Sequence, residues 1–173
     1  MAEIRSIGLS YIKIGDIAED GGMGQSLSAL GVTYQDTAEL VQDEPEVTNI
    51  FSEENDEPEE VIETQGVKKL KWSIMNYDPD QLVRVLGGTA TGNSPNKVWN
   101  SPVSKEPIEQ SIEILTKYNY KIQIARAKIT AKLNFQFRKK GVALVDIEAT
   151  ILTPTKSNLA PVLAGKVAEE PES

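Results

Sequence analysis

Apolar and polar residues alternate over long stretches of this chain, and a two-residue period is typical of half-buried β-strands. The strictest alternation covers residues 129–137, and residues 145–151 repeat it after the turn Lys139-Lys140-Gly141. We therefore predict a β-hairpin from these two runs, with the odd-numbered residues up to Phe137 facing the core. Residues 67–74 alternate in the same way and predict a further strand.

Shorter runs of the same kind predict additional strands at residues 3–13, 37–42, 47–51, 61–65, 109–117 and 120–126. Glu44-Pro45 separates the second run from the third, which suggests that these two strands pair with each other. A turn at Tyr118-Asn119 joins the last two runs into a predicted hairpin. Residues 107–116 also fit a short helix, because Ile108, Ile112 and Leu115 fall in line, but we favour the strand.

One segment, residues 78–87, carries the signals of an α-helix. Asp78 suits the N-cap, Pro79 suits the first helical position, and Gly87 suits the left-handed residue that ends a helix. Three apolar residues at helical spacing form a stripe that we expect to cover the core: Leu82, Val85 and Leu86. Arg84 is expected to point outward from this helix.

The remaining segments are rich in glycine, proline or charge and predict loops. Residues 15–33 and 88–97 are glycine-rich, and residues 52–60 (SEENDEPEE) predict an exposed, mobile acidic loop. Residues 156–173 predict a flexible C-terminal tail after one β domain at residues 1–155. The predicted fold is mainly β, an antiparallel β-sandwich or barrel with one short flanking α-helix and a long acidic loop.

Charge is segregated along the 173 residues. Between Lys13 and Lys68 the chain has fifteen carboxylates and no basic residue. Residues 115–145 reverse the balance with basic residues only: Lys117, Lys121, Arg126, Lys128, Lys132, Arg138, Lys139 and Lys140. Such segregation favours head-to-tail docking between copies of the chain, with an acidic face against a basic one. The plainer interpretation is that both runs are solvated surfaces.

The composition removes most familiar catalytic and metal chemistry. The chain has no histidine and no cysteine, so it offers no imidazole base, thiolate nucleophile or thiolate zinc site. GGTATGNS at 87–94 imitates a phosphate-binding loop, but Asn93 stands where the lysine is needed and the segment follows a predicted helix. Acidic residues 55–60 lack the spacing of a calcium loop. We expect no catalytic residue, no cofactor and no metal site.

Charge, hydropathy and the two tryptophans also bear on which partners the protein can bind. A net charge of −8 disfavours nucleic-acid binding, and no apolar run is long enough to span a membrane. Trp72 lies on the same side of its strand as Leu70 and Ile74, which predicts a core position, whereas Trp99 is less constrained and suits an interface. Stacking on these tryptophans would suit a carbohydrate- or surface-binding β-sandwich module, which is the alternative function.

Several short segments, taken in order, carry a resemblance to a known family. They are Val41-Gln42-Asp43-Glu44, Phe51-Ser52-Glu53-Glu54, Glu57-Pro58, Leu70-Lys71-Trp72, Asp78-Pro79-Asp80-Gln81-Leu82, Leu86-Gly87-Gly88, Ala127-Lys128-Ile129-Thr130-Ala131 and Asp146-Ile147-Glu148-Ala149-Thr150-Ile151-Leu152-Thr153-Pro154. Over residues 35–155 this succession resembles the tail tube proteins of tailed bacteriophages, which form the conduit for DNA ejection.

The resemblance implies a virion structural protein, not an enzyme, that forms homohexameric rings stacked head to tail. Its implied partners are further copies of itself and other tail proteins, and double-stranded DNA passes through the lumen without specific binding. It also implies assembly in the bacterial host cytoplasm and a final location in the tail of the virion, with no membrane contact.

The long acidic loop would reach the neighbouring ring, where the eight basic residues named above are its expected contacts. The loop residues expected to make these contacts are Glu53, Glu54, Asp56, Glu57, Glu59 and Glu60. Acids on or beside the short strands are the candidates for lining an electronegative lumen: Glu39, Asp43 and Glu46.

Overall fold

The computed structural model describes residues 8–168, and its fold is mainly β, with 46% of the chain in strands and 5% in a helix. All of its strand pairs are antiparallel, which confirms the predicted fold class. Among the described residues, no helix is both long and apolar enough to cross a membrane.

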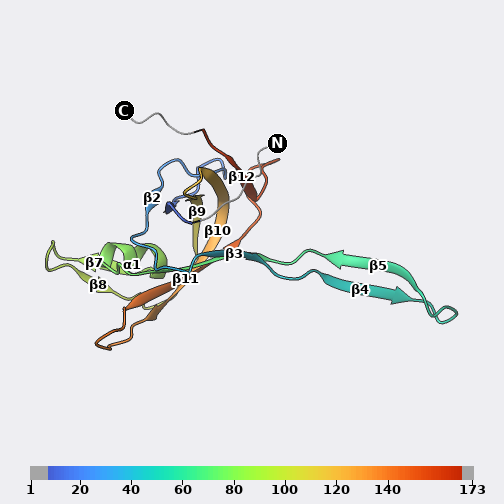
Figure 1. Cartoon of the computed structure of the whole chain (residues 1–173), viewed down its shortest axis with the longest axis horizontal. Coiled ribbons are helices and arrows are strands. Elements are labelled where there is room, and N and C mark those ends of the chain that lie inside the picture. The colour runs from blue at the N-terminus through green and yellow to red at the C-terminus, as the bar shows by residue number, and fades with distance from the viewer. Residues whose placement is uncertain (1–7, 169–173) are drawn as a thin grey trace.

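One large sheet forms the body of the protein (Figure 1). Its strands are β1 (Tyr11–Gly15), β2 (Ser28–Ala29), β3 (Glu39–Gln42), β6 (Lys68–Ile74), β9 (Ile108–Leu115), β10 (Tyr120–Asn134), β11 (Leu144–Ile151) and β12 (Val162–Lys166). They follow the order β2-β1-β9-β10-β11-β6-β3, and β12 pairs with β10. Within residues 8–168 the sheet stays open between β2 and β3, so it is not a closed barrel.

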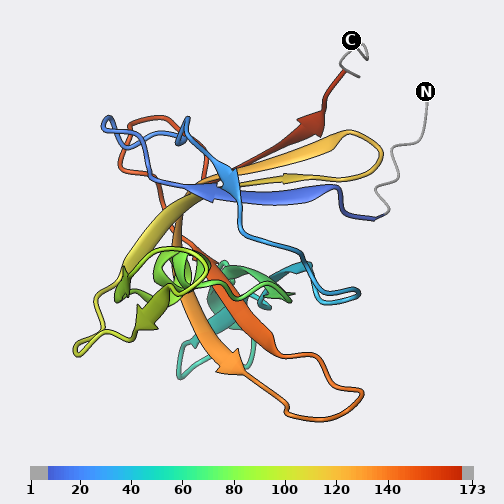
Figure 2. The ribbon, with the colours of Figure 1, turned by 90° about the vertical axis from the view of Figure 1, so that its left-hand side faces the viewer.

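The long strand β10 bends, so the sheet has two parts, which we call its two levels. One contains β1, β2, β9 and β12 with the first half of β10, and the other contains β3, β6 and β11 with the second half of β10 (Figure 2). Strand β10 pairs with β9 on one side, while on the other side its first half pairs with β12 and its second half with β11. The β9 register shifts between Ile124 and Ala127, which is a β-bulge, and a bulge bends the strand. Figure 2 shows the result, with β1 and β12 at one end of the body and the β10–β11 hairpin at the other.

The core lies between these two levels and consists mainly of branched aliphatic side chains. Ile14, Ile112 and Ile124 come from one level, and Trp72 and Val145 come from the other. Trp72 is only 2% exposed, which confirms its predicted core position. The apolar alternation of the sequence therefore marks the inward side of β6 and β11 correctly.

The one helix among the described residues, α1 (Pro79–Leu86), covers one side of this core. Pro79 opens it, and Gly87 ends it with a φ of +80° and a backbone N–H that donates to the carbonyl of Val83. Asp78 takes the N-cap position, as predicted, but makes no side-chain cap hydrogen bond. Leu82 and Val85 are buried, as predicted.

The prediction that Arg84 points outward is wrong. Its guanidinium donates hydrogen bonds to the carbonyl oxygens of Ile14, Ser28 and Ala29, at 2.9, 3.1 and 2.9 Å. These carbonyls belong to β1 and β2, so Arg84 ties the helix to that edge of the sheet. Partial burial lowers the pKa of Arg84, and nearby Asp16 opposes this effect.

Two small hairpins stand outside the large sheet: β4 (Glu46–Phe51) with β5 (Pro58–Thr64), and β7 (Thr89–Thr91) with β8 (Val98–Asn100). The predicted pairing of residues 37–42 with 47–51 is wrong, because β3 pairs with β6 while β4 pairs with β5. The glycine-rich segment 88–97 is also more ordered than predicted, since it contains β7 and the turn that leads to β8.

The two ends of the chain differ from the prediction as well. Strand β1 starts at Tyr11, so only the end of the predicted strand 3–13 is a strand, and residues 3–7 lie outside the described residues. Within the predicted flexible tail, residues 162–166 form β12 and pair with β10 from Tyr120 to Ile124. This part of the tail therefore belongs to the sheet, and residues 169–173 lie outside the described residues.

Candidate functional site

The most prominent surface feature is the hairpin of β4 and β5, residues 46–64, which we call the arm (Figure 1). It extends away from the body, and every residue of both strands is exposed. The predicted acidic loop 52–60 is shorter than expected, since β5 already begins at Pro58. Glu59 and Glu60 therefore lie on a strand, and residues 52–57 form the acidic tip of the arm.

The acidic tip has an internal structure of its own. The Ser52 hydroxyl donates to Glu59 Oε1 at 3.2 Å, and the backbone N–H of Glu57 donates to Asn55 Oδ1 at 3.5 Å. The second contact joins residues two apart, as in a turn in which an Asn side chain replaces a backbone acceptor. The predicted acidic loop is therefore a short turn on a two-stranded ribbon.

The arm exposes apolar side chains on both of its faces. In the ladder Thr48 lies opposite Ile62, and Asn49 lies opposite Val61, so successive pairs place an apolar residue on alternate faces. The exposed apolar side chains of the arm are Val47, Ile50, Phe51, Val61 and Ile62. A two-stranded hairpin alone is only marginally stable in water, and exposed apolar patches mark contact surfaces. The arm therefore suits contact with a partner.

The arm is also strongly acidic and contains no lysine or arginine. Its acids are Glu46, Glu53, Glu54, Asp56, Glu57, Glu59, Glu60 and Glu63. None of these carboxylates forms an ion pair with another described residue. The arm is therefore an uncompensated negative surface, and a partner that covers it needs positive charge.

The base of the arm is fixed to the body at Asp43. The backbone N–H of Asp43 donates to the carbonyl of Val67 at 2.9 Å, and its carboxylate lies 3.6 Å from Lys69 Nζ. Gly66 packs against the same residue so closely that a Cβ would overlap the Asp43 carbonyl group. These contacts hold the arm to the edge of the large sheet.

Two of the three candidate lumen acids, Asp43 and Glu46, lie at this base, while Glu39 lies at the other end of β3, and all three are exposed. Glu39 opens β3 and lies opposite Lys71, and Asp43 is paired with Lys69. Glu46 opens β4 and has no such neighbour among the described residues. The lysines of β6 therefore compensate part of the negative charge at Glu39 and Asp43, whereas Glu46 keeps its charge.

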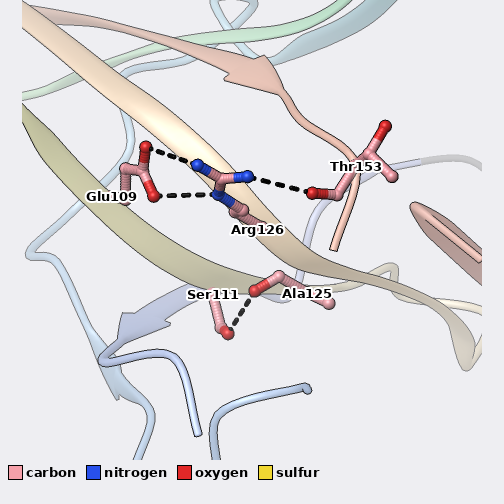
Figure 3. A network of polar contacts seen from close by, with 5 residues as sticks. All are labelled: Glu109, Ser111, Ala125, Arg126 and Thr153. Carbon is pink, nitrogen blue, oxygen red and sulfur yellow. Dashed lines mark hydrogen bonds and ion pairs between the residues drawn. The ribbon is translucent and has the colours of Figure 1, made fainter. Parts of the chain in front are cut away.

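The predicted basic face is already occupied in part by acids of the same chain. Arg126 holds Glu109 on β9 through two hydrogen bonds, and it also donates to the carbonyl of Thr153 at 3.2 Å (Figure 3). The hydrogen bonds from Arg126 lower the pKa of Glu109 and raise that of Arg126 itself. Arg126 therefore serves the internal structure of the sheet.

Ser111, beside this pair in Figure 3, ties the glycine-rich loop to the sheet. Its buried hydroxyl donates to the carbonyl of Ala125 at 2.7 Å and accepts from the N–H of Gly24 at 2.9 Å. The glycine-rich segment is thus held against β9 and β10.

Lys121 takes part in a second internal cluster, centred on Glu113. Its Nζ lies 4.0 Å from Glu113 Oε1, which also accepts the Tyr11 hydroxyl at 2.8 Å, while Gln123 donates to Oε2 at 3.1 Å. Partial burial raises the pKa of Glu113, but these hydrogen bonds and the nearby charges of Lys121 and Lys13 outweigh it, so the net shift is downward.

Lys128 and Lys132 point outward from β10, but acids from the neighbouring strands lie beside them. Lys128 is the cross-strand partner of Glu109, and Lys132 is that of Asp146 on β11. Residues that are all basic in sequence are therefore interleaved with acids in space, because adjacent strands come from distant segments. Lys128 and Lys132 therefore stay candidates for contact with a neighbouring arm, but acids of the same chain partly compensate their charge.

The turn of the β10–β11 hairpin is different, because its cations have no such neighbours. Arg138, Lys139 and Lys140 are exposed, and none forms an ion pair with another described residue. Phe137 is 92% exposed and β10 ends at Asn134, so the predicted inward position of Phe137 is wrong. We call residues 137–140 the basic tip. Lys117 is likewise exposed, at the start of the β9–β10 turn.

Sequence reasoning missed the apolar part of these surfaces. Phe51 precedes the acidic tip and is 57% exposed, and Phe137 precedes the three cations of the basic tip. In both places an aromatic residue adjoins a run of like charge, which is an unusual neighbour for a core residue. That adjacency is a signal in the sequence that both phenylalanines lie at the surface.

The tryptophans are not arranged as sugar-stacking platforms. Trp72 is buried, and Trp99 on β8 packs against the core while its Nε1 donates to the carbonyl of Gly87 at 2.9 Å. Trp99 was predicted to suit an interface, but these contacts give it a role in fixing the β7–β8 hairpin to the end of α1.

A groove of about 820 Å³ opens between the two levels of the sheet. Ile12, Ile114, Leu40 and Leu70 line it, with Tyr34 at the segment before β3. Within residues 8–168, no cluster of three or more acidic side chains is placed to hold a metal ion. Charged residues also line the groove, among them Asp36, Glu39 and Lys117.

A scan of the chain against protein-family models gives no match, and neither does a comparison with curated proteins.

Proposed function

We propose that this protein is a structural subunit of a phage tail tube, in which hexameric rings stack head to tail around an electronegative conduit for DNA ejection. The observation that carries the proposal is the arm, a long hairpin whose two faces are both exposed and carry apolar side chains. An arm of this kind gains its stability from a partner. Further copies of the chain are the partner that the charge pattern favours.

The distribution of charge supports a passive conduit. Most cations of the sheet stand beside acids of the same chain, as in the Arg126–Glu109 and Lys71–Glu148 pairs. The acids of the arm and its base remain in excess, in keeping with the net charge of −8. An electronegative wall repels the phosphates of DNA and lets the duplex slide, whereas free cations would retain it.

Among the candidate lumen acids, Glu46 is the strongest, because no lysine lies opposite it. Glu39 and Asp43 contribute less negative potential to the lumen, because Lys71 and Lys69 lie beside them. In the proposed assembly the subunit binds copies of itself and other tail proteins, has no enzymatic role, assembles in the bacterial host cytoplasm and ends in the tail of the virion.

The carbohydrate- or surface-binding alternative has less support. It relied on tryptophan platforms, and the indole rings of Trp72 and Trp99 are engaged in the core and in the β7–β8 hairpin. No exposed tryptophan remains among the described residues for stacking on a sugar ring.

Negative-stain electron microscopy of the purified protein over a range of concentrations tests the proposal. We expect rings with about six subunits, or tubes built from such rings. The matched control replaces residues 46–64 with Asn-Gly, which closes β3 and β6 into a short hairpin and removes the arm. This variant is expected to stay monomeric and to keep the circular dichroism of a β protein. Wild-type protein that remains monomeric at high concentration would refute the tube.

A further inference from the structure

The arm and the β10–β11 hairpin end in tips of opposite charge. The acidic tip carries Glu53, Glu54, Asp56 and Glu57, and the basic tip carries Arg138, Lys139 and Lys140. In Figure 1 the arm runs to one side of the body, while the β10–β11 turn leaves it on the opposite side. The two tips of one molecule therefore do not meet, although two molecules in line bring them together.

The basic tip is built to present its side chains outward. The N–H of Arg138 donates to the carbonyl of Gln136 at 3.0 Å, and the N–H of Gly141 donates to that of Arg138 at 3.2 Å, which defines a tight turn. The ring of Phe137 stands edge-on to Phe135 with centroids 6.4 Å apart, and Phe135 contacts Tyr77 at 4.9 Å. The exposed ring of Phe137 therefore packs against Phe135, next to the three cations of the basic tip.

These cations are free to pair with a partner, unlike the cations that already have an acidic partner. Arg126 and Lys121 are bound to Glu109 and Glu113, and Lys69, Lys71, Lys97 and Lys156 also have acidic partners in the same chain. At the basic tip, no carboxylate of a described residue forms an ion pair with these cations. An acidic partner that docks there gains attraction without breaking an existing ion pair.

We propose that the basic tip is the docking site for the acidic tip of a second copy of this chain. Arg138, Lys139 and Lys140 pair with the tip carboxylates, and Phe137 packs against the exposed Phe51 at the end of β4. This inference rests on the proposed function for the ring or tube that results, but the contact itself needs only two copies.

The geometry of the contact explains why it propagates. Acidic and basic tips are different surfaces, so the contact is head to tail and leaves one free tip of each kind. Such contacts close into rings or continue into filaments. Since both tips are exposed to water, salt weakens the attraction, and association is expected to fall as ionic strength rises above about 0.15 M.

A charge-exchange experiment tests the proposal. One variant reverses the basic tip (R138E, K139E and K140E), and the other reverses the acidic tip (E53K, E54K and E57K). Each variant alone is expected to lose self-association, by at least about tenfold in Kd measured by sedimentation. Mixed in equal amounts, the two are expected to associate again, because each arm then faces a tip of opposite charge.

The matched control makes the same change of charge at lysines outside the predicted contacts, with K68E, K105E and K166E, none of which forms an ion pair with a described residue. Circular dichroism verifies the fold of every variant, and this control is expected to associate like the wild type. A second variant, F137S, leaves the charges unchanged and is expected to weaken association through the loss of aromatic contact.

The outcomes separate this inference from the tube. Rings or tubes that form normally from the tip-reversed protein would overturn the docking site and leave the tube intact. Open chains that depend on both tips, without rings, would uphold the docking site and refute the tube. If the basic tip instead retains duplex DNA or anionic vesicles while its reversal leaves self-association unchanged, it serves another anionic partner and the proposal fails.

Discussion

The guanidinium of Arg126 donates two hydrogen bonds to the carboxylate of Glu109, from Nε to Oε2 at 2.8 Å and from Nη2 to Oε1 at 3.0 Å. The pair spans β9 and β10 next to the bulge, and the same guanidinium reaches the carbonyl of Thr153 beyond β11. One side chain therefore ties three segments together where the sheet bends. Two-point contacts of this kind fix geometry better than a single ion pair.

Replacing Arg126 with Gln should lower the thermal midpoint of the folded protein at pH 7. Because the hydrogen bonds from Arg126 hold the pKa of Glu109 below its ordinary value, the carboxylate contributes stability above about pH 4.5. That contribution disappears as the pH falls through the lowered folded-state pKa. The difference in melting temperature between wild type and R126Q is thus expected to shrink in acid.

Melting curves between pH 7 and pH 3, followed by circular dichroism, provide the measurement. K128Q is the matched control, because Lys128 stands opposite Glu109 without a hydrogen bond to it. Its effect should be smaller at every pH. A difference for R126Q that stays constant down to pH 3 would mean that packing of the arginine, and not the charged pair, supplies the stability.

The helix α1 is predicted to act as a structural cover for the core. Leu82 is buried against the core, so L82D places a carboxylate in an apolar site and should cost several kcal/mol, out of a total of about 5 to 15 for a domain. L82M, which nearly conserves volume, should cost less than about 1.5 kcal/mol. Urea denaturation compares the two, and equal stability of L82D and wild type would place the helix in solvent.

Arg84 provides a separate test of how the helix is attached. R84M leaves the carbonyls of Ile14, Ser28 and Ala29 without their donor, and we expect a loss of about 1 to 3 kcal/mol. R84K keeps the charge, but one ammonium group cannot reproduce the planar fork that serves several acceptors. An intermediate stability for R84K is therefore expected, together with faster amide exchange at β1 and β2. Equal stability of R84K and wild type would show that charge alone suffices.

How far the sequence predicts this fold is clearest along β10. The apolar alternation predicts two strands, residues 120–126 and 129–137, where the structure has one strand that ends at Asn134. Ile124 and Ala127 both point inward although they are three residues apart, because the bulge between them inserts an extra residue. The bulge shifts the alternation by one residue, so a period-two pattern breaks inside a continuous strand.

The pairing of the two arm strands and the C-terminal strand lacked a signal for a different reason. Both faces of β4 and β5 are exposed, so burial imposes no alternation, and the pairing of β4 with β5 follows from their ladder alone. Strand β12 is short and mostly exposed, and its partner Tyr120–Ile124 is distant in sequence. The acidic run of the arm is visible in the sequence, and Phe51 and Phe137 adjoin runs of like charge, but only the structure shows that both rings are exposed.

The pairing of most sheet cations leads to the prediction that bears most directly on the conduit. Assembled protein should not bind duplex DNA, although DNA is the proposed cargo, because the excess charge at the base of the arm is negative and because, in the proposed assembly, a neighbouring subunit covers the free cations of the basic tip. Gel-shift titration at low salt is the measurement, since phosphate contacts are strongest there.

E46K supplies the complementary test at the strongest lumen candidate. It replaces an exposed acid that has no opposing lysine with a cation, so assembled E46K protein should retain duplex DNA at low salt and release it as salt rises. E63K, which reverses an exposed acid on the opposite face of the arm, is the matched control and should retain less DNA. Salt-dependent binding by the wild-type assembly, tighter than about micromolar, would replace the passive conduit with a nucleic-acid-binding scaffold.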